Sequence, residues 1–380
     1  MFLPILRAIM APTVVLQLLL GWGAVLTMFL ASPMLDSPIA TPMLFGILAA
    51  IVVVIVICAF GVVTHAEHLA RRLGDPYGTL VLTLSIVIIE VILISAVMLG
   101  PGDYPTIARD SVMAVSMIIL NLVIGVALIV GSSRHKNLRP NSVGASSYVS
   151  ILVVLLAVAF AFPHFLGDNG AYVPGAATVV AILTLSMYGY FLYRQMGPQR
   201  ADFQDITLNE IPSAPANRFD TSISRVLTQH RGEILSRSIV LVLTVLPIVL
   251  LSHDMATLLD FGLDRVGAPV ALSGILIAAI VFLPETLTAI RAAAFGEMQR
   301  VSNLCHGALI STVGLTIPAV LLIGLFTGQT VILAEEPENL LLLALTMVLT
   351  MIAMLGQKVT ALHGAAHLMT FVLYLLVMFS

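Results

Sequence analysis

Long apolar stretches recur along almost the whole chain, and they constrain its fold more than any other feature of the sequence. A helix needs about 20 apolar residues to cross the hydrocarbon core of a membrane. Stretches of about this length lie near 11–31, 42–64, 78–99, 110–131, 147–166, 173–193, 236–252, 268–290, 304–326, 339–355 and 363–379. We therefore predict an all-α polytopic membrane protein with about eleven transmembrane helices.

Charged residues make up only 10% of the 380-residue chain, whereas a soluble protein carries roughly a quarter. This deficit indicates that much of the surface faces lipid rather than water. The net charge of −3 gives no basic field of the kind that a nucleic-acid-binding protein needs. Cys58 and Cys305 lie in apolar stretches without metal-binding or disulfide spacing, and we interpret both as buried thiols.

The distribution of basic residues predicts the orientation of the helices, because short cytoplasmic connections are rich in Lys and Arg. With the N-terminus in the cytoplasm, the cytoplasmic connections hold nearly all of the 17 basic residues, and only Arg109 and Arg265 fall on the opposite side. The opposite connections carry acidic residues instead, such as Asp103, Asp168 and Glu335. We therefore expect a cytoplasmic N-terminus.

The two halves of the chain share a pattern of turn residues, which predicts an internal repeat. Gly74-Asp75-Pro76 precedes the third span, and Gly267-Ala268-Pro269 precedes the eighth. Equivalent helices are five spans apart, and since five is odd they cross the membrane in opposite directions. Such inverted-topology repeats build substrate sites between them at mid-membrane. The predicted parts are an extra N-terminal helix, a five-helix repeat, a cytoplasmic linker and a second five-helix repeat, at residues 1–40, 41–193, 194–235 and 236–380.

Two acidic residues, Glu90 and Glu285, lie inside predicted spans, and no Lys or Arg lies mid-span to neutralise them. A carboxylate in the bilayer is costly unless it is protonated, paired or metal-bound, so such residues usually mark a transport pathway. The alternative is a permanently protonated Glu that is hydrogen-bonded to a neighbouring helix. Two such residues at matching places in two halves favour the functional interpretation. Pro284 lacks a backbone donor, so we expect either free carbonyls near position 280 or a simple packing kink.

Two carboxylates carry a charge of −2, which one Ca²⁺ or two protons neutralise. A carrier with such a site should reorient when it is loaded with either and poorly when it is empty, which makes exchange obligatory. Ca²⁺ prefers about six to eight oxygen ligands. We expect Glu90 and Glu285 to hold the metal ion, with further oxygens from Asn121, Ser85 and Ser311. The set contains no thiol or imidazole, which argues against zinc or copper, and Na⁺ or K⁺ is an alternative substrate.

Histidines lie near the cytoplasmic ends of several spans and suggest other functions. His65, His68, His363 and His367 have the helical spacing of a metal-binding cluster, so a membrane metalloenzyme is a rival hypothesis. It leaves both buried glutamates and the repeat unexplained. A milder hypothesis places His65, His367 and His306 on a proton path or in a pH sensor. The plainest interpretation is that these histidines mark the ends of spans. A channel is less favoured than a carrier, because discrete glutamates in inverted repeats suit alternating access.

Several motifs together resemble the calcium/proton antiporters of the ChaA/CAX type. They are Thr64-His65-Ala66-Glu67 with the following residues to Glu90, Gly267-Ala268-Pro269 leading to Pro284-Glu285, and His363-Gly364-Ala365-Ala366-His367-Leu368. The resemblance implies two inverted five-helix repeats with an extra N-terminal helix, in a bacterial inner membrane. It further implies Ca²⁺ export driven by proton entry, with Na⁺ or K⁺ as further substrates and no cofactor. The cation-binding acidic residues of the family fall on Glu90 and Glu285.

Two features depart from this family. The linker at 194–237 lacks the acidic stretch of many bacterial members, so regulation through such a stretch is not expected here. The Gly-Asn-Ala-x-Glu signature of the eukaryotic branch is also missing before Glu90, where Ile86 to Ile89 stand instead. The sequence indicates no oligomeric state.

Overall fold

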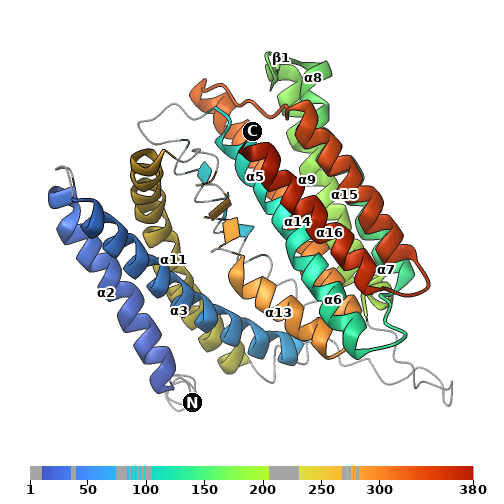
Figure 1. The fold of residues 1–380 in the computed structure, drawn as a ribbon, viewed down its shortest axis with the longest axis horizontal. Coiled ribbons are helices and arrows are strands. Elements are labelled where there is room, and N and C mark those ends of the chain that lie inside the picture. Colours follow the sequence, from blue (N-terminus) through green and yellow to red (C-terminus); the bar gives the residue numbers. More distant parts are fainter. Residues whose placement is uncertain are drawn as a thin grey trace. The chain divides into compact units, whose positions relative to one another are not determined.

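The chain folds into two compact units of helices (Figure 1). The computed structural model describes residues 11–35, 40–73, 105–204, 231–267 and 282–379, with single positions between 84 and 98 and between 272 and 279. Unit 1 comprises Met1–Leu82 and Ile206–Arg265, and unit 2 comprises Thr83–Asp205 and Val266–Ser380. Each unit therefore draws on both halves of the sequence.

The membrane-spanning helices confirm the predicted fold class. Among the described residues, nine helices are long and apolar enough to cross a membrane, and each falls on a predicted span. The other two predicted spans, 78–99 and 268–290, run largely over residues outside the described ranges. The protein is thus an all-α polytopic membrane protein. Its spans bear many large apolar side chains on their outer faces, such as Leu19 and Phe29, as lipid contact requires.

Unit 1 is built from three long helices, namely α2 (Pro12–Leu35), α3 (Thr41–Leu73) and α11 (Arg231–Val266). Trp22 Nε1 in α2 donates to the carbonyl of Leu243 in α11 at 3.1 Å. The two helices approach closely at Gly21, where a Cβ atom would lie 3.0 Å from Pro247 Cβ. Glycine at this position therefore lets α2 pack directly against the proline-bearing stretch of α11.

Helix α11 is longer than the sequence predicts, since it continues from the expected end near 252 to Val266. The predicted span ends near 252 because Ser252, His253 and Asp254 follow its apolar run. Ser252 is instead buried, and its hydroxyl donates to the carbonyl of Ile248 one turn earlier. A hydroxyl that returns to its own helix in this way needs no outside partner, so the helix does not end there.

Unit 2 contains the remaining described elements. They are α5 (Ile107–Met117), η1 (Ile118–Val123), α6 (Ile124–Arg134), α7 (Ser142–Leu156), η2 (Ala157–Ala161), α8 (Pro163–Leu166), β1 (Gly167–Asp168), β2 (Ala171–Tyr172), α9 (Pro174–Met196), η3 (Arg200–Phe203), α13 (Leu283–Ala294), α14 (Met298–Thr327), α15 (Pro337–Leu355) and α16 (Ala361–Met378). Pro174 and Pro337 stand in the first turns of α9 and α15, where the missing N–H breaks no helical bond.

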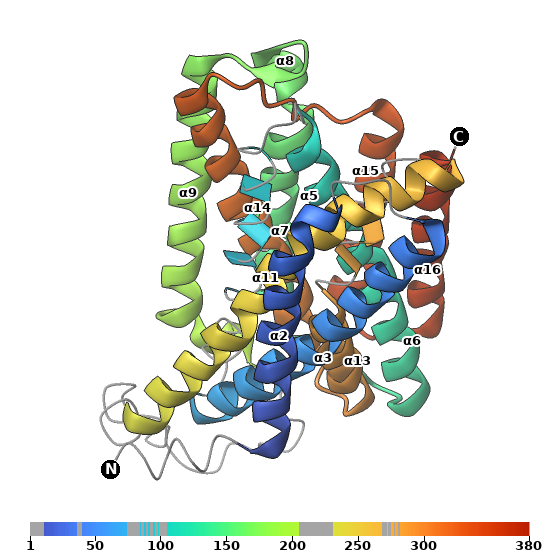
Figure 2. The ribbon, with the colours of Figure 1, turned by 90° about the vertical axis from the view of Figure 1, so that its left-hand side faces the viewer.

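Helix α14 forms the centre of unit 2, because 22 of its 30 residues are buried. It packs against α9, α7, α13 and α5, and Figure 2 shows α9 and α14 side by side. A transmembrane helix that is hidden from lipid on most of its surface can carry polar side chains, and α14 carries many. Its burial explains why the polar residues of this span are tolerated.

Two of the described spans of unit 2 contain a π-helical segment, η1 and η2, and we call η1 the π turn. Helices α5 and α6 form a continuous span through η1. In η1 the backbone hydrogen bonds join residues five apart instead of four. Such turns insert a residue and are often found at functional sites. Next to it, α6 and α16 lie so close that a Cβ atom at Gly125 would be 3.0 Å from the carbonyl oxygen of Gly364. Gly364 of the His-Gly-Ala-Ala-His motif thus brings α16 against the span that holds the π turn.

A short antiparallel hairpin of β1 and β2 lies at one end of unit 2 and binds the segment that precedes α15. The amides of Leu333 and Ala334 both donate to the carbonyl of Gly170, and the amide of Glu335 donates to the carbonyl of Phe160. We call residues 331–336 the strap. Its backbone bonds fix Glu335 over the end of the helices.

The two units do not follow the predicted repeat boundaries, which stay a prediction. Unit 1 takes α3 and α11, the first helix of each predicted repeat, together with α2. Unit 2 takes the described remainder of both halves. Two halves that contribute equivalent helices to each unit are what an inverted repeat would produce. The connection between the helices on either side of the predicted linker at 194–235 is shorter than predicted, because α9 runs to Met196 and α11 begins at Arg231.

Candidate cation site

The two predicted acidic residues come together in unit 2. Glu90 and Glu285 are each buried to 5% exposure. Their carboxyl groups lie near enough for their charges to interact. Among the described residues, neither forms a salt bridge with Lys or Arg. Two carboxyls in one dry interior call for a cation or for protons, because unpaired buried negative charge is very costly.

Glu285 stands in the first turn of α13, because the helix begins at Leu283 and Pro284 follows at once. Phe282 caps this turn, and its carbonyl accepts from Thr286 Oγ1 at 2.9 Å. The proline therefore marks the start of a helix, and the carbonyls expected near position 280 lie outside the described residues. The positive end of the α13 dipole faces the Glu285 carboxyl, which helps to hold negative charge there.

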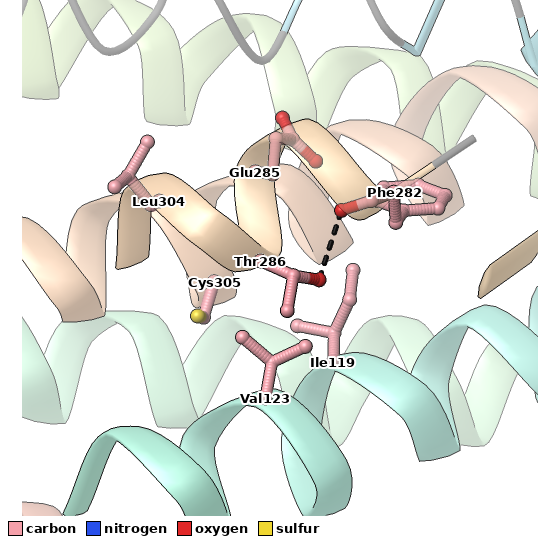
Figure 3. A pocket seen from close by; sticks show the side chains of 7 residues that line it. All are labelled: Ile119, Val123, Phe282, Glu285, Thr286, Leu304 and Cys305. Carbon is pink, nitrogen blue, oxygen red and sulfur yellow. Dashed lines mark hydrogen bonds between the residues drawn. The ribbon is translucent and has the colours of Figure 1, made fainter. Parts of the chain in front are cut away.

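A cavity lies beside Glu285, between α13, α14 and the π turn (Figure 3). Its walls are mainly apolar and are formed by Ile119, Val123, Phe282, Glu285, Thr286, Leu304 and Cys305. Both carboxylate oxygens of Glu285 are buried and lack a hydrogen-bond partner among the described residues. A buried carboxyl of this kind is open to a ligand, since native proteins normally satisfy such groups.

Glu90 is held by α14. Thr312 Oγ1 donates to Glu90 Oε2 at 2.7 Å, while Oε1 has no partner among the described residues. The predicted ligand of this span is Ser311, the residue before Thr312. Adjacent helical residues point about 100° apart. Only the rotation of α14 tells which of the two hydroxyls meets Glu90, and no sequence signal gives that rotation.

Ser311 contacts other groups in the structure. Its hydroxyl donates to the carbonyl of Gly307 and accepts from Tyr188 of α9 at 3.1 Å. Ser85, a further predicted ligand, lies outside the described residues. The structure therefore brings Glu90 and Glu285 together with Thr312, and it places Ser311 at the contact between α14 and α9.

Asn121 lies in the π turn, with its amide group bonded to α15 and α16. Its Nδ2 donates to Thr346 Oγ1 at 2.8 Å, and its Oδ1 contacts His367 Nδ1 at 3.2 Å. The same turn contributes Ile119 and Val123 to the wall of the cavity beside Glu285. The apolar side chains of the π turn thus line the cavity, whereas Asn121 of the same turn points toward α15 and α16.

The predicted histidines are divided between the two units. His65 lies on α3 in unit 1 and is buried, with both ring nitrogens lacking a hydrogen-bond partner in the described ranges. His306 and His367 are fully buried in unit 2. His363 has a local role, since its Nδ1 accepts from the amide of Thr360 in a capping box at the start of α16.

Comparison with known proteins assigns the chain to a family. Residues 43–197 and 232–380 match the model of the sodium/calcium exchanger protein family, and the chain belongs to that family. It is 30% identical over 378 residues to the sodium-potassium/proton antiporter ChaA of Escherichia coli (strain K12), a match that covers 97% of this chain and 95% of ChaA. The protein is therefore an antiporter of the cation exchanger class rather than a metalloenzyme.

Solved structures show the same fold. A structure of the Ca²⁺/H⁺ antiporter protein YfkE matches with a TM-score of 0.65 at 15% identity, covering 97% of this chain and 98% of that one. The H⁺/Ca²⁺ exchanger CAX matches with a TM-score of 0.63 at 15% identity, covering 96% of this chain and 88% of that one. At such low identity the likeness concerns the fold alone.

Proposed function

We propose that this protein is a secondary antiporter that exports Ca²⁺ in exchange for H⁺ at the Glu90–Glu285 pair. The observation that carries the proposal is the pair itself, two buried carboxyls in one unit without a basic partner among the described residues. Membership of the sodium/calcium exchanger family supports cation exchange, and the structural neighbours YfkE and CAX are named as exchangers of this pair of ions.

The charge of the pair explains why exchange is obligatory. Two carboxylates are neutralised by one Ca²⁺ or by two protons, and either load lets the site change its exposure without bare charge in the membrane. The empty, doubly charged site reorients slowly because of its desolvation cost. Oxygen ligands favour Ca²⁺ over zinc or copper, and Thr312 supplies a hydroxyl beside Glu90.

We place the protein in the bacterial inner membrane with its N-terminus in the cytoplasm. The support is the excess of Lys and Arg in alternate connections, from which only Arg109 and Arg265 depart. In this orientation the strap and the β1–β2 hairpin face the outside. Protons that enter down their gradient then drive Ca²⁺ out of the cell.

A monovalent cation is the second candidate substrate, and one observation favours it. ChaA, which matches nearly the whole chain at 30% identity, is named a sodium-potassium/proton antiporter. The same two carboxyls serve such an exchange, with one site proton replaced by each Na⁺ or K⁺. The mechanism and the site residues are unchanged, and only the coordinating oxygens decide the preference.

Everted membrane vesicles test the substrate. Respiration acidifies their interior, and a fluorescent probe reports the collapse of the pH gradient when a cation is added. We expect Ca²⁺ to cause prompt collapse, which Glu90→Gln and Glu285→Gln both abolish. Collapse by Na⁺ or K⁺ but not by Ca²⁺ would instead assign the monovalent function. Equal responses in wild type and both Gln variants would contradict the site.

A further inference from the structure

Helix α14 makes two sets of contacts, and they lie on opposite faces. Residues three or four apart share one face of a helix. One such row consists of Asn303, Gly307, Ser311 and Gly314. Thr312 follows Asn303 by nine residues, which is about two and a half turns, so it lies on the opposite face. Cys305 precedes Thr312 by seven residues, about two turns, and shares that face.

The face with Thr312 belongs to the proposed cation site. Thr312 Oγ1 donates to Glu90 Oε2 at 2.7 Å. Cys305 and its neighbour Leu304 line the cavity beside Glu285 (Figure 3). The rotation of α14 about its own axis therefore decides which side chains this helix presents to the two carboxyls.

The opposite face packs against two buried tyrosines, whose exposed fractions are 0% for Tyr148 and 4% for Tyr188. Tyr148 of α7 donates to Asn303 Oδ1 at 3.1 Å. Tyr188 belongs to α9, which lies beside α14 (Figure 2), and its hydroxyl donates to Ser311 Oγ at 3.1 Å. Ser311 uses its own hydrogen for the carbonyl of Gly307 at 2.8 Å, so it accepts from Tyr188.

Tyr188 meets α14 at the level of Thr312, because its hydroxyl bonds the residue just before it. The ring of Tyr188 lies against Gly314, where a Cβ atom would be 2.9 Å from Cγ of the ring. Glycine at this position therefore lets the backbone of α14 rest directly on the ring. A directional hydrogen bond and close packing on the same face leave the helix little freedom to rotate.

We propose that Tyr188 is a positioning residue of the cation site, which fixes the rotation of α14 so that the Thr312 hydroxyl meets Glu90. The inference rests on the proposed function, in which Glu90 binds the transported cation. Tyr188 acts through α14 and Thr312, so its loss weakens the same bond that Thr312 makes. The helix bundle stays folded without the tyrosine hydroxyl, since Ser311 keeps its bond to the Gly307 carbonyl.

Tyr188→Phe keeps the ring and removes only the hydroxyl. Isotope uptake into liposomes at a series of Ca²⁺ concentrations gives the half-maximal concentration and the maximal rate. We expect Tyr188→Phe to raise the half-maximal Ca²⁺ concentration about threefold at an unchanged maximal rate, because binding alone is weakened. Gly314→Ala, which crowds the ring, should raise it as well. Tyr172→Phe is the matched control, since it removes a tyrosine bond of 2.6 Å to the Val158 carbonyl of η2 and should leave the Ca²⁺ dependence unchanged.

A double-mutant cycle separates positioning from a general loss of stability. Thr312→Val alone is expected to raise the half-maximal Ca²⁺ concentration about tenfold. Tyr188→Phe combined with Thr312→Val should also give about tenfold, because the bond that Tyr188 positions is already lost. Two independent effects would multiply to about thirtyfold.

An unchanged Ca²⁺ dependence in Tyr188→Phe, or a thirtyfold effect in the double variant, would overturn the proposal. An equal shift in Tyr172→Phe would overturn it too, because the loss of any tyrosine hydroxyl bond would then suffice. In these cases the inference fails alone, provided that exchange still requires Glu90 and Glu285. If wild type shows no Ca²⁺ exchange, or if Glu90→Gln exchanges normally, the proposed function fails and this inference fails with it.

Discussion

Thr312 of α14 donates a hydrogen bond of 2.7 Å to the carboxyl group of Glu90. In a buried setting, loss of this donor leaves a carboxyl oxygen without a partner, which costs about 1–3 kcal/mol. The bond also orients the carboxyl for a cation. A single hydroxyl therefore bears on both the fold and the affinity of the proposed site.

Thr312→Val is expected to raise the Ca²⁺ concentration for half-maximal exchange by about tenfold, which corresponds to about 1.4 kcal/mol. Thr312→Ser keeps the hydroxyl and should restore most of the affinity. Isotope uptake into liposomes at a series of Ca²⁺ concentrations measures the change. Ser311→Ala serves for comparison, since that hydroxyl contacts Tyr188 and the Gly307 carbonyl. Equal effects of Thr312→Val and Ser311→Ala would contradict the assignment.

At the scale of elements, the strap contains a buried ionisable residue, Glu335, which lies outside the membrane-spanning helices. Glu335 is only 3% exposed, and its Oε2 accepts from Asn339 Nδ2 at 2.9 Å. Burial raises the pKa of the Glu335 carboxyl to about 7, although the Asn339 bond and the Arg109 guanidinium oppose this. The Arg109 Nε lies 3.9 Å from the carboxyl. The strap thus contains a carboxyl that titrates near neutral pH.

The raised pKa makes a prediction about stability. Between about pH 4.5 and 7 the folded protein holds more protons at Glu335 than the unfolded chain does. Stability from this group is therefore full below pH 4.5 and is lost as the pH rises through about 7. The loss is on the order of 3 kcal/mol at most.

Glu335→Gln should flatten the profile of melting temperature against pH between about pH 4.5 and 7. Glu336→Gln, whose side chain is 70% exposed, should leave it unchanged, and identical profiles for both would refute the role of burial.

The contact between α6 and α16 depends on two glycines. A Cβ atom at Gly364 would clash with the carbonyl oxygen of Gly125 and approach Ile129 Cγ1 to 2.7 Å. Gly364→Val should lower the stability of purified protein by about 1–3 kcal/mol, because the helices must separate. Gly189→Ala in α9 meets nothing within 4 Å and should be neutral or slightly stabilising. Thermal unfolding in detergent compares them, and equal melting temperatures would argue against the close contact.

At the scale of the whole molecule, hydropathy predicted most of the fold. The described spans fall where apolar runs of bilayer length do, because lipid contact leaves a strong signal in sequence. The extension of α11 past Ser252 was not predicted. In the sequence, a serine whose hydroxyl bonds to its own helix cannot be told from a polar residue that begins a connection. The π turn at Ile118–Val123 leaves no such signal. Glu90 and Glu285 were found because buried charge is rare, whereas Thr312 depended on helix rotation.

The described parts of each unit combine helices from both halves of the chain, and this arrangement suits alternating access. The Glu90–Glu285 pair of the proposed cation site lies in unit 2. Unit 1, with its three long helices, holds none of the residues assigned to the proposed cation site.

The central claim is that cation and protons share the Glu90–Glu285 pair. It is tested most directly by adding Ca²⁺ to purified protein in weakly buffered detergent solution and measuring the protons released as Ca²⁺ binds. We predict proton release that saturates together with Ca²⁺ binding in wild type and that is lost in Glu90→Gln and Glu285→Gln. Ca²⁺ binding without proton release, or release that persists in both variants, would contradict the account.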